Sequence, residues 1–351
     1  MTIDRDKTTL WRGIAILGIV VHNILVGNFG FVGCNEMTFK IAKTEAFWGS
    51  LTRPSIMLLG DLFAFWGWIG VPVFVFISGF GLETKYGKGS LNSSSFLASN
   101  YRKLITLLLP AVLLYSLLFL FSRDWLSLLS SVLSLSLLGN VWYMVLPLNP
   151  SIYWYFGLTW ELYLFYFIFR LIHKSHTSMN ICMLIWSLVG FLLMAIAYWA
   201  FKESSQSLEW LRRNFIGWVP IFCLGIWVAN TKRNLRLPSN WLLLVLMALV
   251  LFVIICIASF NFYSWLFVPL IALLLLLVLG EISCLMNLTK KLFVWIGGLS
   301  SYLFVVHPMA RGIAHKVFGN HIVLMLFSYL LLTFAMAICF KYAKEKISQR
   351  I

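Results

Sequence analysis

The residues best suited to chemistry lie in a stretch where polar side chains are rare. Residues 10–26 read LWRGIAILGIVVHNILV, an apolar run that holds Arg12, His22 and Asn23. A cation or an imidazole is costly in hydrocarbon, so such residues usually face a protein interior and serve a function. An imidazole titrates near neutral pH, which suits His22 to accept a proton as a general base. In the alternative interpretation, Arg12 extends to the lipid headgroups and His22 is a packing residue.

Further ionisable residues accompany the later apolar runs. Glu161 and His307 lie within two of these runs; Asp61 lies just before another run, and Arg311 lies just after the run that holds His307. Such residues in several runs favour a buried polar site over isolated packing residues. We predict that Glu161 either orients His22 or binds substrate hydroxyls. The alternatives are a hydrogen-bonded structural carboxylate at Glu161 and a kinked helix end at His307-Pro308.

The composition indicates an all-α polytopic membrane protein with a single domain over residues 1–351. Of the 351 residues, 61% are hydrophobic and only 11% are charged, and many runs approach the roughly 20 residues that cross a bilayer. The net charge of +15 is not accompanied by basic runs with interleaved aromatic residues, so we expect no nucleic-acid partner. The six cysteines are scattered without a CxxC or Cys/His cluster, so we expect neither a disulfide framework nor a metal.

The distribution of Lys and Arg indicates which of the eleven apolar runs cross the membrane. If all eleven cross, more cations face outward than inward, whereas most face the cytoplasm if residues 125–146 do not cross. We therefore predict about ten transmembrane helices, both termini in the cytoplasm, and a re-entrant or surface segment at 125–146. Such a segment would have to be covered by protein or line a cavity. The predicted spans are 10–26, 62–82, 104–121, 153–171, 181–201, 215–229, 241–257, 262–279, 292–309 and 322–340.

This topology places the polar residues in two layers. At about 1.5 Å of rise per residue, His22 lies roughly 18 Å above the inner end of its span, and Glu161 and His307 also fall in the outer half. The second layer lies at the cytoplasmic end and consists of Arg12, Ser78, Gly79, Lys85, Lys88, Arg102 and Lys103. A cationic layer suits an anionic ligand such as a nucleotide diphosphate. The alternative for these cations is ordinary positive-inside topology.

Five pieces of the chain, taken in order, resemble one family. The pieces are RGIAIL from Arg12 with His22, VPVFVFISGF over 71–80, Arg102-Lys103 before an apolar run to Pro110, WYFGLTWELY over 154–163, and Ser300 through Phe304 to His307. The chain resembles the acyltransferase-three family, bacterial membrane proteins that transfer acetyl or other acyl groups from acyl-CoA to sugar hydroxyls. The pieces are fairly specific for the family, but not for a substrate.

The resemblance implies a ten-span fold in the bacterial inner membrane. Acetyl-CoA or another acyl-CoA would enter from the cytoplasm and meet the hydroxyl of an extracytoplasmic glycan or small molecule. Arg12 and His22 carry over as the essential pair, and His22 would take the proton of the attacking hydroxyl. Glu161 would orient His22 or bind acceptor hydroxyls, and Asn23 or a backbone N–H would stabilise the oxyanion.

The remaining candidates divide between the two substrates. For the donor, Arg12, Arg102 and Lys103 would hold the phosphates of CoA, and Ser78-Gly79 would let the pantetheine pass close to the backbone. The residues predicted to bind the acceptor are Asp61, Trp154, His307 and Arg311.

Two departures from the family pattern affect these assignments. Nine residues separate Arg12 from His22 where the family usually has ten, which on a regular helix sets the two about 80° apart with roughly 15 Å of rise between them. Either a helix irregularity corrects the aim of His22, or the two residues serve different ligands, which we favour. The family often has two arginines spaced i, i+3 before the third span, but here Lys103 pairs with Thr106. A lysine binds phosphate as a point charge, so a bidentate clamp is not expected.

Two other classes of protein fit part of the pattern. A proton-coupled secondary transporter or flippase also carries intramembrane His, Glu and Arg residues, although this chain has no paired halves with matching broken spans. The third class is a non-catalytic membrane sensor or assembly subunit. Release of free CoA that depends on His22 favours the enzyme, whereas counter-flow of substrate without CoA release favours the transporter.

Overall fold

The computed structural model contains helices and no strand in the parts of the chain that it describes. These parts are residues 3–26, 29–87, 89, 91–142, 153–172, 176–201, 206–231, 237–319 and 321–348. The chain folds into two compact units. Unit 1 consists of Met1–Phe74 and Asn234–Ile351, and unit 2 consists of Val75–Arg233.

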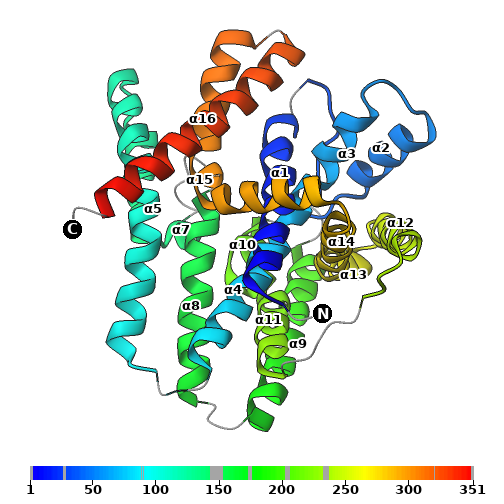
Figure 1. Ribbon diagram of the computed structural model, residues 1–351, viewed down its shortest axis with the longest axis vertical. Coiled ribbons are helices and arrows are strands. Elements are labelled where there is room, and N and C mark those ends of the chain that lie inside the picture. The colour runs from blue at the N-terminus through cyan, green and yellow to red at the C-terminus, as the bar shows by residue number, and fades with distance from the viewer. Residues whose placement is uncertain are drawn as a thin grey trace. The chain divides into compact units, whose positions relative to one another are not determined.

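Unit 1 is organised around its first helix. Its elements are α1 (Arg5–Leu25), α2 (Ile41–Thr52), α3 (Leu58–Trp66), η1 (Gly67–Gly70), the start of α4 (Val71–Tyr86), α12 (Trp241–Ala258), α13 (Phe262–Trp265), α14 (Val268–Cys284), α15 (Asn287–Phe318) and α16 (Ile322–Ser348). Helix α1, blue in Figure 1, contacts α3, η1, α14 and α15. Helix α15 in turn packs against α16. The helix that carries Arg12 and His22 is therefore surrounded by protein on several sides.

Local contacts explain where α1 begins and how it is held. The side chain of Asp4 accepts a hydrogen bond from the backbone N–H of Lys7 at 2.8 Å, which caps the first turn. Lys7 also forms an ion pair with Glu281 of α14 at 3.2 Å. Farther along, the hydroxyl of Tyr329 on α16 donates to the Val20 carbonyl at 2.8 Å. Polar contacts thus fix both halves of α1 within an apolar core.

Unit 2 contains the remaining helices. These are the rest of α4, α5 (Ser93–Ser122), α6 (Trp125–Leu133), η2 (Ser134–Ser136), α7 (Gly139–Trp142), α8 (Trp154–Ile172), α9 (His176–Phe201), α10 (Gln206–Arg213), η4 (Phe215–Gly217) and α11 (Val219–Thr231). Helices α4 and α8 are joined by a buried hydrogen bond, in which the hydroxyl of Tyr166 donates to Glu83 at 2.8 Å. Arg170 completes this polar group, because its guanidinium lies 4.0 Å from Glu83.

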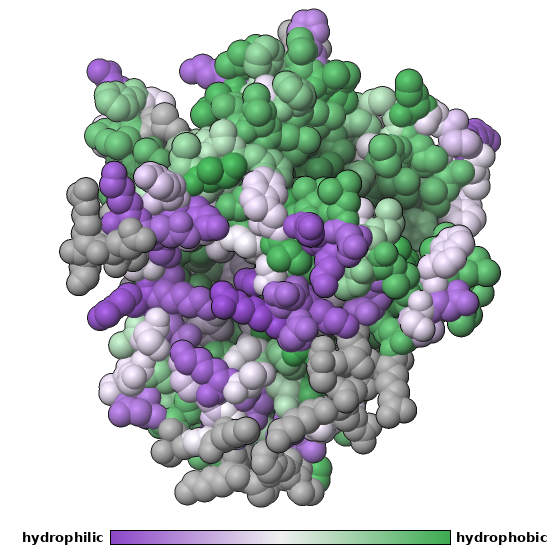
Figure 2. Space-filling view, viewed as in Figure 1, coloured by the Kyte–Doolittle hydropathy of each residue, from purple (hydrophilic) through white to green (hydrophobic). Residues whose placement is uncertain are grey.

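Helix length and surface character confirm an all-α polytopic membrane protein. Within the described residues, seven helices are long and apolar enough to cross a bilayer: Arg5–Leu25, Leu58–Tyr86, Ser93–Ser122, Met179–Phe201, Trp241–Ala258, Asn287–Phe318 and Ile322–Lys346. Helices α8, α11 and α14 occupy the other three predicted spans. Figure 2 shows apolar side chains over the outer turns of α15 and α16, where Phe327 and Leu331 are 67% and 60% exposed. Such a surface is typical of contact with lipid.

The segment predicted not to cross consists of short helical pieces. Residues 143–146 lie outside the described part of the chain. In the rest, Trp125–Ser136 is an apolar helix followed by α7. Twelve residues rise only about 18 Å, short of the roughly 30 Å hydrocarbon core, so this helix cannot span a bilayer.

Helices α1 and α15 approach so closely that their contact requires glycine. A Cβ atom added to Gly13 would collide with the backbone carbonyl of Phe293, and one added to Gly297 would collide with that of Thr9. Small residues permit this close backbone approach between membrane helices. The neighbouring Gly298 has nothing within 4 Å of the same position, so only one of the two adjacent glycines is needed for packing.

Replacing Gly297 with alanine is therefore expected to lower the free energy of unfolding by about 1–3 kcal/mol, because the helices must separate to admit the methyl group. Thermal unfolding of the detergent-solubilised protein, followed by tryptophan fluorescence, measures this. The matched control is Gly298→Ala, which is expected to be neutral or to stabilise by up to about 1 kcal/mol through helix propensity. Equal melting temperatures for the two variants would contradict the close contact.

Candidate functional site

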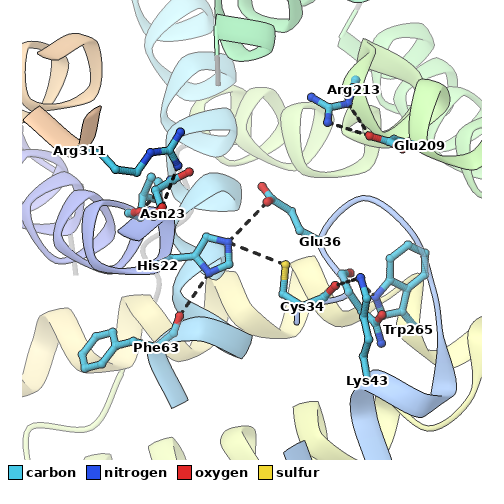
Figure 3. A network of polar contacts seen from close by, with 12 residues as sticks. His22, Asn23, Cys34, Glu36, Lys43, Phe63, Glu209, Arg213, Trp265 and Arg311 are labelled. Carbon is cyan, nitrogen blue, oxygen red and sulfur yellow. Dashed lines mark hydrogen bonds and ion pairs between the residues drawn. The ribbon is translucent and has the colours of Figure 1, made fainter. Parts of the chain in front are cut away.

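The side chain of His22 is buried in unit 1 and held in one orientation. It projects from the last turn of α1 and is only 3% exposed. Its Nδ1 atom lies 3.2 Å from the backbone carbonyl of Phe63 on α3, as Figure 3 shows. A carbonyl can only accept a hydrogen bond, so Nδ1 carries the proton and Nε2 has the lone pair in the neutral ring. This tautomer is the one that can act as a base at Nε2.

Two residues that follow α1 face that lone pair. The Sγ atom of Cys34 and the Oε2 atom of Glu36 each lie 3.8 Å from Nε2 of His22. We refer to these three residues as the His22 cluster. The 3.8 Å separation from Glu36 is long for a hydrogen bond but suits an ion pair when the ring is protonated. The cluster therefore combines a base with a carboxylate that would stabilise its protonated form. Neither Cys34 nor Glu36 was among the site residues predicted from the sequence.

The loop that carries Cys34 and Glu36 is fixed by other parts of unit 1. The Nζ atom of Lys43 on α2 donates to the Cys34 carbonyl at 2.6 Å, and the indole of Trp265 on α13 donates to the Asn35 carbonyl at 2.9 Å. The side chain of Asn35 in turn donates to Thr44 at 3.0 Å. Because the backbone carbonyls of Cys34 and Asn35 are both anchored, the side chains of Cys34 and Glu36 are held against the imidazole.

An apolar cavity of about 440 Å³ lies beside α1 in the same unit. Its lining residues are hydrophobic side chains and glycines from α1, α3, η1, α12, α14 and α15, among them Gly18, Phe63 and Gly67. Phe63 also accepts the hydrogen bond from His22, and a Cβ atom at Gly67 would lie 2.5 Å from that of His22. The cavity therefore adjoins the helix turn that presents the imidazole. Its lining suits an acyl chain better than charged phosphates.

Asn23 and Arg311 lie next to His22 and are joined to each other. The Asn23 amide donates to the Ile19 carbonyl of its own helix at 2.9 Å. The guanidinium of Arg311 on α15 donates to the Asn23 carbonyl at 2.8 Å, as Figure 3 shows. The structure thus brings together His22, Asn23 and Arg311 at the end of α1.

Asp61 and His307 also belong to unit 1, and both have local partners. Asp61 accepts a hydrogen bond from the backbone N–H of Val32 at 3.1 Å, so it holds the loop that leads to Cys34. The Nδ1 atom of His307 lies 3.1 Å from the Leu303 carbonyl in its own helix. Its Nε2 atom is buried without a hydrogen-bond partner in the described part of the chain.

Arg12 faces a different direction from His22. Helix α1 is continuously α-helical from Arg5 to Leu25, so no irregularity within it aligns the two side chains. Among the residues that the structure describes, the guanidinium of Arg12 donates only within its own helix, to the Thr8 carbonyl at 3.4 Å and the Thr9 hydroxyl at 3.0 Å. No carboxylate of the described residues lies within ion-pair distance of it. This arrangement leaves the guanidinium available to an anionic ligand.

In unit 2, Glu161 and Trp154 lie on α8. The Oε2 atom of Glu161 accepts a hydrogen bond from the Phe215 N–H at 2.8 Å, while Oε1 has no partner among the residues described here. Trp154 stacks on Trp218 with ring centroids 6.1 Å apart. Glu161 therefore helps to position η4 and keeps one carboxylate oxygen for a further donor.

The predicted donor-binding residues of unit 2 differ in their surroundings. A Cβ atom at Gly79 would collide with the Phe222 carbonyl, so α11 already occupies the close approach that this glycine permits. The adjacent Ser78 is half-buried on α4. Arg102 and Lys103 are exposed near the beginning of α5. Gly79 thus has a packing role, whereas the two cations are accessible.

Comparison with known proteins decides the family. A family model described as an acyltransferase domain matches residues 7–343, nearly the whole chain and both units. The protein belongs to this acyltransferase family. No curated protein and no solved structure matches the chain. The resemblance inferred from the five sequence pieces is thereby confirmed, and the protein is an acyltransferase embedded in a membrane.

Proposed function

We propose that this membrane acyltransferase moves an acetyl or other acyl group from cytoplasmic acyl-CoA to a hydroxyl of an extracytoplasmic glycan or small molecule, with His22 as the general base. The observation that carries the proposal is the orientation of the buried imidazole. The bond from Nδ1 to the Phe63 carbonyl leaves the lone pair on Nε2, the atom that faces Cys34 and Glu36.

The chemistry requires a proton acceptor because a neutral hydroxyl is a poor nucleophile. Nε2 of His22 takes the hydroxyl proton as the oxygen attacks the thioester carbonyl. The tetrahedral intermediate then expels the CoA sulfur, which receives the proton from the imidazolium. The carboxylate of Glu36, 3.8 Å from Nε2, stabilises the imidazolium between these steps. Asn23 or a backbone N–H would stabilise the oxyanion.

The two substrates would engage different residues. Arg12, Arg102 and Lys103 would bind the phosphates of acetyl-CoA, with Ser78 beside the pantetheine, whereas Gly79 packs against the Phe222 carbonyl of α11. Glu161, Trp154, Asp61, His307 and Arg311 would contribute to the acceptor site. The Oε1 atom of Glu161 is buried without a partner among the described residues, and this supports its role, since a sugar hydroxyl can donate to it. The contacts that Asp61 and Arg311 make around His22 support positioning roles for both residues.

The acyl-ester content of the surface glycans of the source cell tests the proposed function. Mass spectrometry of glycans from a strain that lacks the gene is expected to show the loss of an ester-linked acyl group, which returns on complementation with the wild-type gene. Identical ester content in both strains, for glycans and secreted metabolites alike, would contradict the proposal.

Replacing Arg102 with alanine is expected to raise the KM for acetyl-CoA by about ten-fold with little change in kcat, because one charge-assisted phosphate contact is lost. Initial rates at varied acetyl-CoA concentrations measure this. Arg123→Ala is the matched control, because Arg123 is exposed at the other end of α5. An unchanged KM for Arg102→Ala would remove Arg102 from the donor site.

The proposed localisation is the inner membrane, with both termini in the cytoplasm, as the Lys and Arg distribution favours. Green fluorescent protein fused to the C-terminus is expected to fluoresce, and alkaline phosphatase fused at the same point is expected to be inactive. The reverse pattern would place the C-terminus outside, and an odd number of crossings would then follow if the N-terminus is inside.

A further inference from the structure

The three residues of the His22 cluster have the composition and spacing of a metal site. His22, Cys34 and Glu36 each offer one ligand atom, and all three atoms lie within 4.8 Å of one another. In a tetrahedral zinc site, bonds of about 2.0–2.3 Å place neighbouring ligand atoms roughly 3.4–3.6 Å apart. The separations of 3.8 Å from Nε2 to Sγ and to Oε2 are close to this range. The third pair, Sγ and Oε2, lies within 4.8 Å, so movement of the Cys34 and Glu36 side chains toward each other would let one ion contact all three atoms.

The surroundings of the cluster also suit a metal. Histidines that bind a metal through one nitrogen usually donate the other N–H to a carbonyl or carboxylate, which fixes the ring. The Phe63 carbonyl has this relation to Nδ1 of His22. The loop that carries the other two ligands is anchored by Lys43 and Trp265, so it is arranged before any ion arrives.

Charge and ligand softness select the kind of ion. A thiolate and a carboxylate together neutralise a divalent cation, which reduces the cost of placing it beside a buried ring. One sulfur, one imidazole nitrogen and one carboxylate oxygen favour zinc or a similar transition metal over magnesium or calcium, which prefer oxygen ligands. Three protein ligands also leave a fourth tetrahedral position for water.

We propose that His22, Cys34 and Glu36 form a binding site for a zinc-like divalent metal. On binding, the thiol of Cys34 loses its proton to solvent and its sulfur bonds to the metal, while Nε2 of His22 donates its lone pair. The bound ion thus occupies the electron pair that base catalysis uses. This consequence rests on the proposed function: zinc inhibits acyl transfer reversibly.

Cobalt substitution tests the site without any measurement of activity. The purified protein is stripped with a chelator and titrated with Co²⁺, which reports a cysteine ligand by a thiolate-to-metal absorption in the near ultraviolet and tetrahedral geometry by visible bands. Both features are expected to saturate at one cobalt per protein and to disappear when zinc is added. Cys34→Ser is expected to lose the near-ultraviolet band. The control Cys339→Ser, which changes an exposed cysteine, is expected to keep it.

A second variant tests the site even if Cys34→Ser fails to fold. Glu36→Gln retains the size of the side chain and is expected to weaken cobalt binding at least about ten-fold while keeping the thiolate band at saturation. Size-exclusion profiles confirm that each variant is folded. The absence of a near-ultraviolet band in the wild type, or its persistence in folded Cys34→Ser, would overturn the site.

Activity measurements then separate the site from the proposed function. Zinc is expected to lower the rate of acyl transfer by about 10²-fold, and a chelator is expected to restore it. A cobalt spectrum without inhibition by zinc would keep the site and overturn the proposed use of the Nε2 lone pair. His22-dependent transfer without a cobalt spectrum would overturn the site and keep the function.

Discussion

Replacing His22 with glutamine is expected to lower kcat for acyl transfer by about 10²–10⁴-fold, the usual contribution of a general base. Glutamine can still donate to the Phe63 carbonyl, but it has no lone pair of comparable basicity with which to take the hydroxyl proton. The KM for acetyl-CoA is expected to change little, because Arg12, the proposed phosphate contact, lies about 15 Å from His22 along α1. Transfer of a radiolabelled acetyl group to the acceptor measures kcat and KM together.

The matched control is His315→Gln. His315 lies in the last turn of α15, is exposed, and should tolerate the change without loss of activity. Melting temperatures in detergent show whether either variant has lost its fold. Turnover of His22→Gln within a few-fold of the wild type would exclude His22 as the base.

Replacing Arg12 with alanine is expected to raise the KM for acetyl-CoA by about 10–100-fold, equivalent to roughly 1.5–3 kcal/mol for a charge-assisted contact with phosphate. Within the described part of the chain, Arg12 donates hydrogen bonds only to its own helix and pairs with no carboxylate, so an anionic ligand would be a suitable partner. Arg12→Lys is expected to fall between the wild type and Arg12→Ala, because lysine keeps the charge but not the planar fork. Initial rates over a range of acetyl-CoA concentrations measure these changes.

Arg5→Ala is the control for Arg12, because Arg5 lies on the same helix and is exposed. Its KM for acetyl-CoA is expected to match that of the wild type. If Arg12→Ala instead lowered the melting temperature and left KM unchanged, Arg12 would be a structural residue and the donor phosphates would bind elsewhere.

The sequence predicted the fold well because the bilayer imposes length and polarity on each span. Every predicted span contains an observed helix, and the segment predicted not to cross contains the short apolar helix Trp125–Ser136. The orientation derived from the charge distribution stays a prediction. Helix breaks inside a run were not predictable from hydropathy. Residues 62–82 read as one apolar span, but the structure has α3, η1 and α4 there, with Gly67 pressed against His22.

The site was only partly predictable. Arg12 and His22 stood out because they interrupt an apolar run, but nothing in that run shows what faces them. Cys34 and Glu36 lie in a polar loop, and only the anchoring of that loop by Lys43 and Trp265 brings them to the imidazole. A search for cysteines adjacent to histidines in sequence misses such a cluster. The cluster could have been found by searching for a cysteine and a carboxylate two residues apart, shortly after a helix with a buried histidine.

Base catalysis by His22 is tested by the release of free CoA from the purified protein, given acetyl-CoA and a de-esterified glycan extract of the cell envelope. We predict that thiol release requires both the extract and His22, and that an equal amount of alkali-labile acetyl ester forms on an acceptor. Counter-flow of substrate across proteoliposomes with no release of CoA would contradict the account.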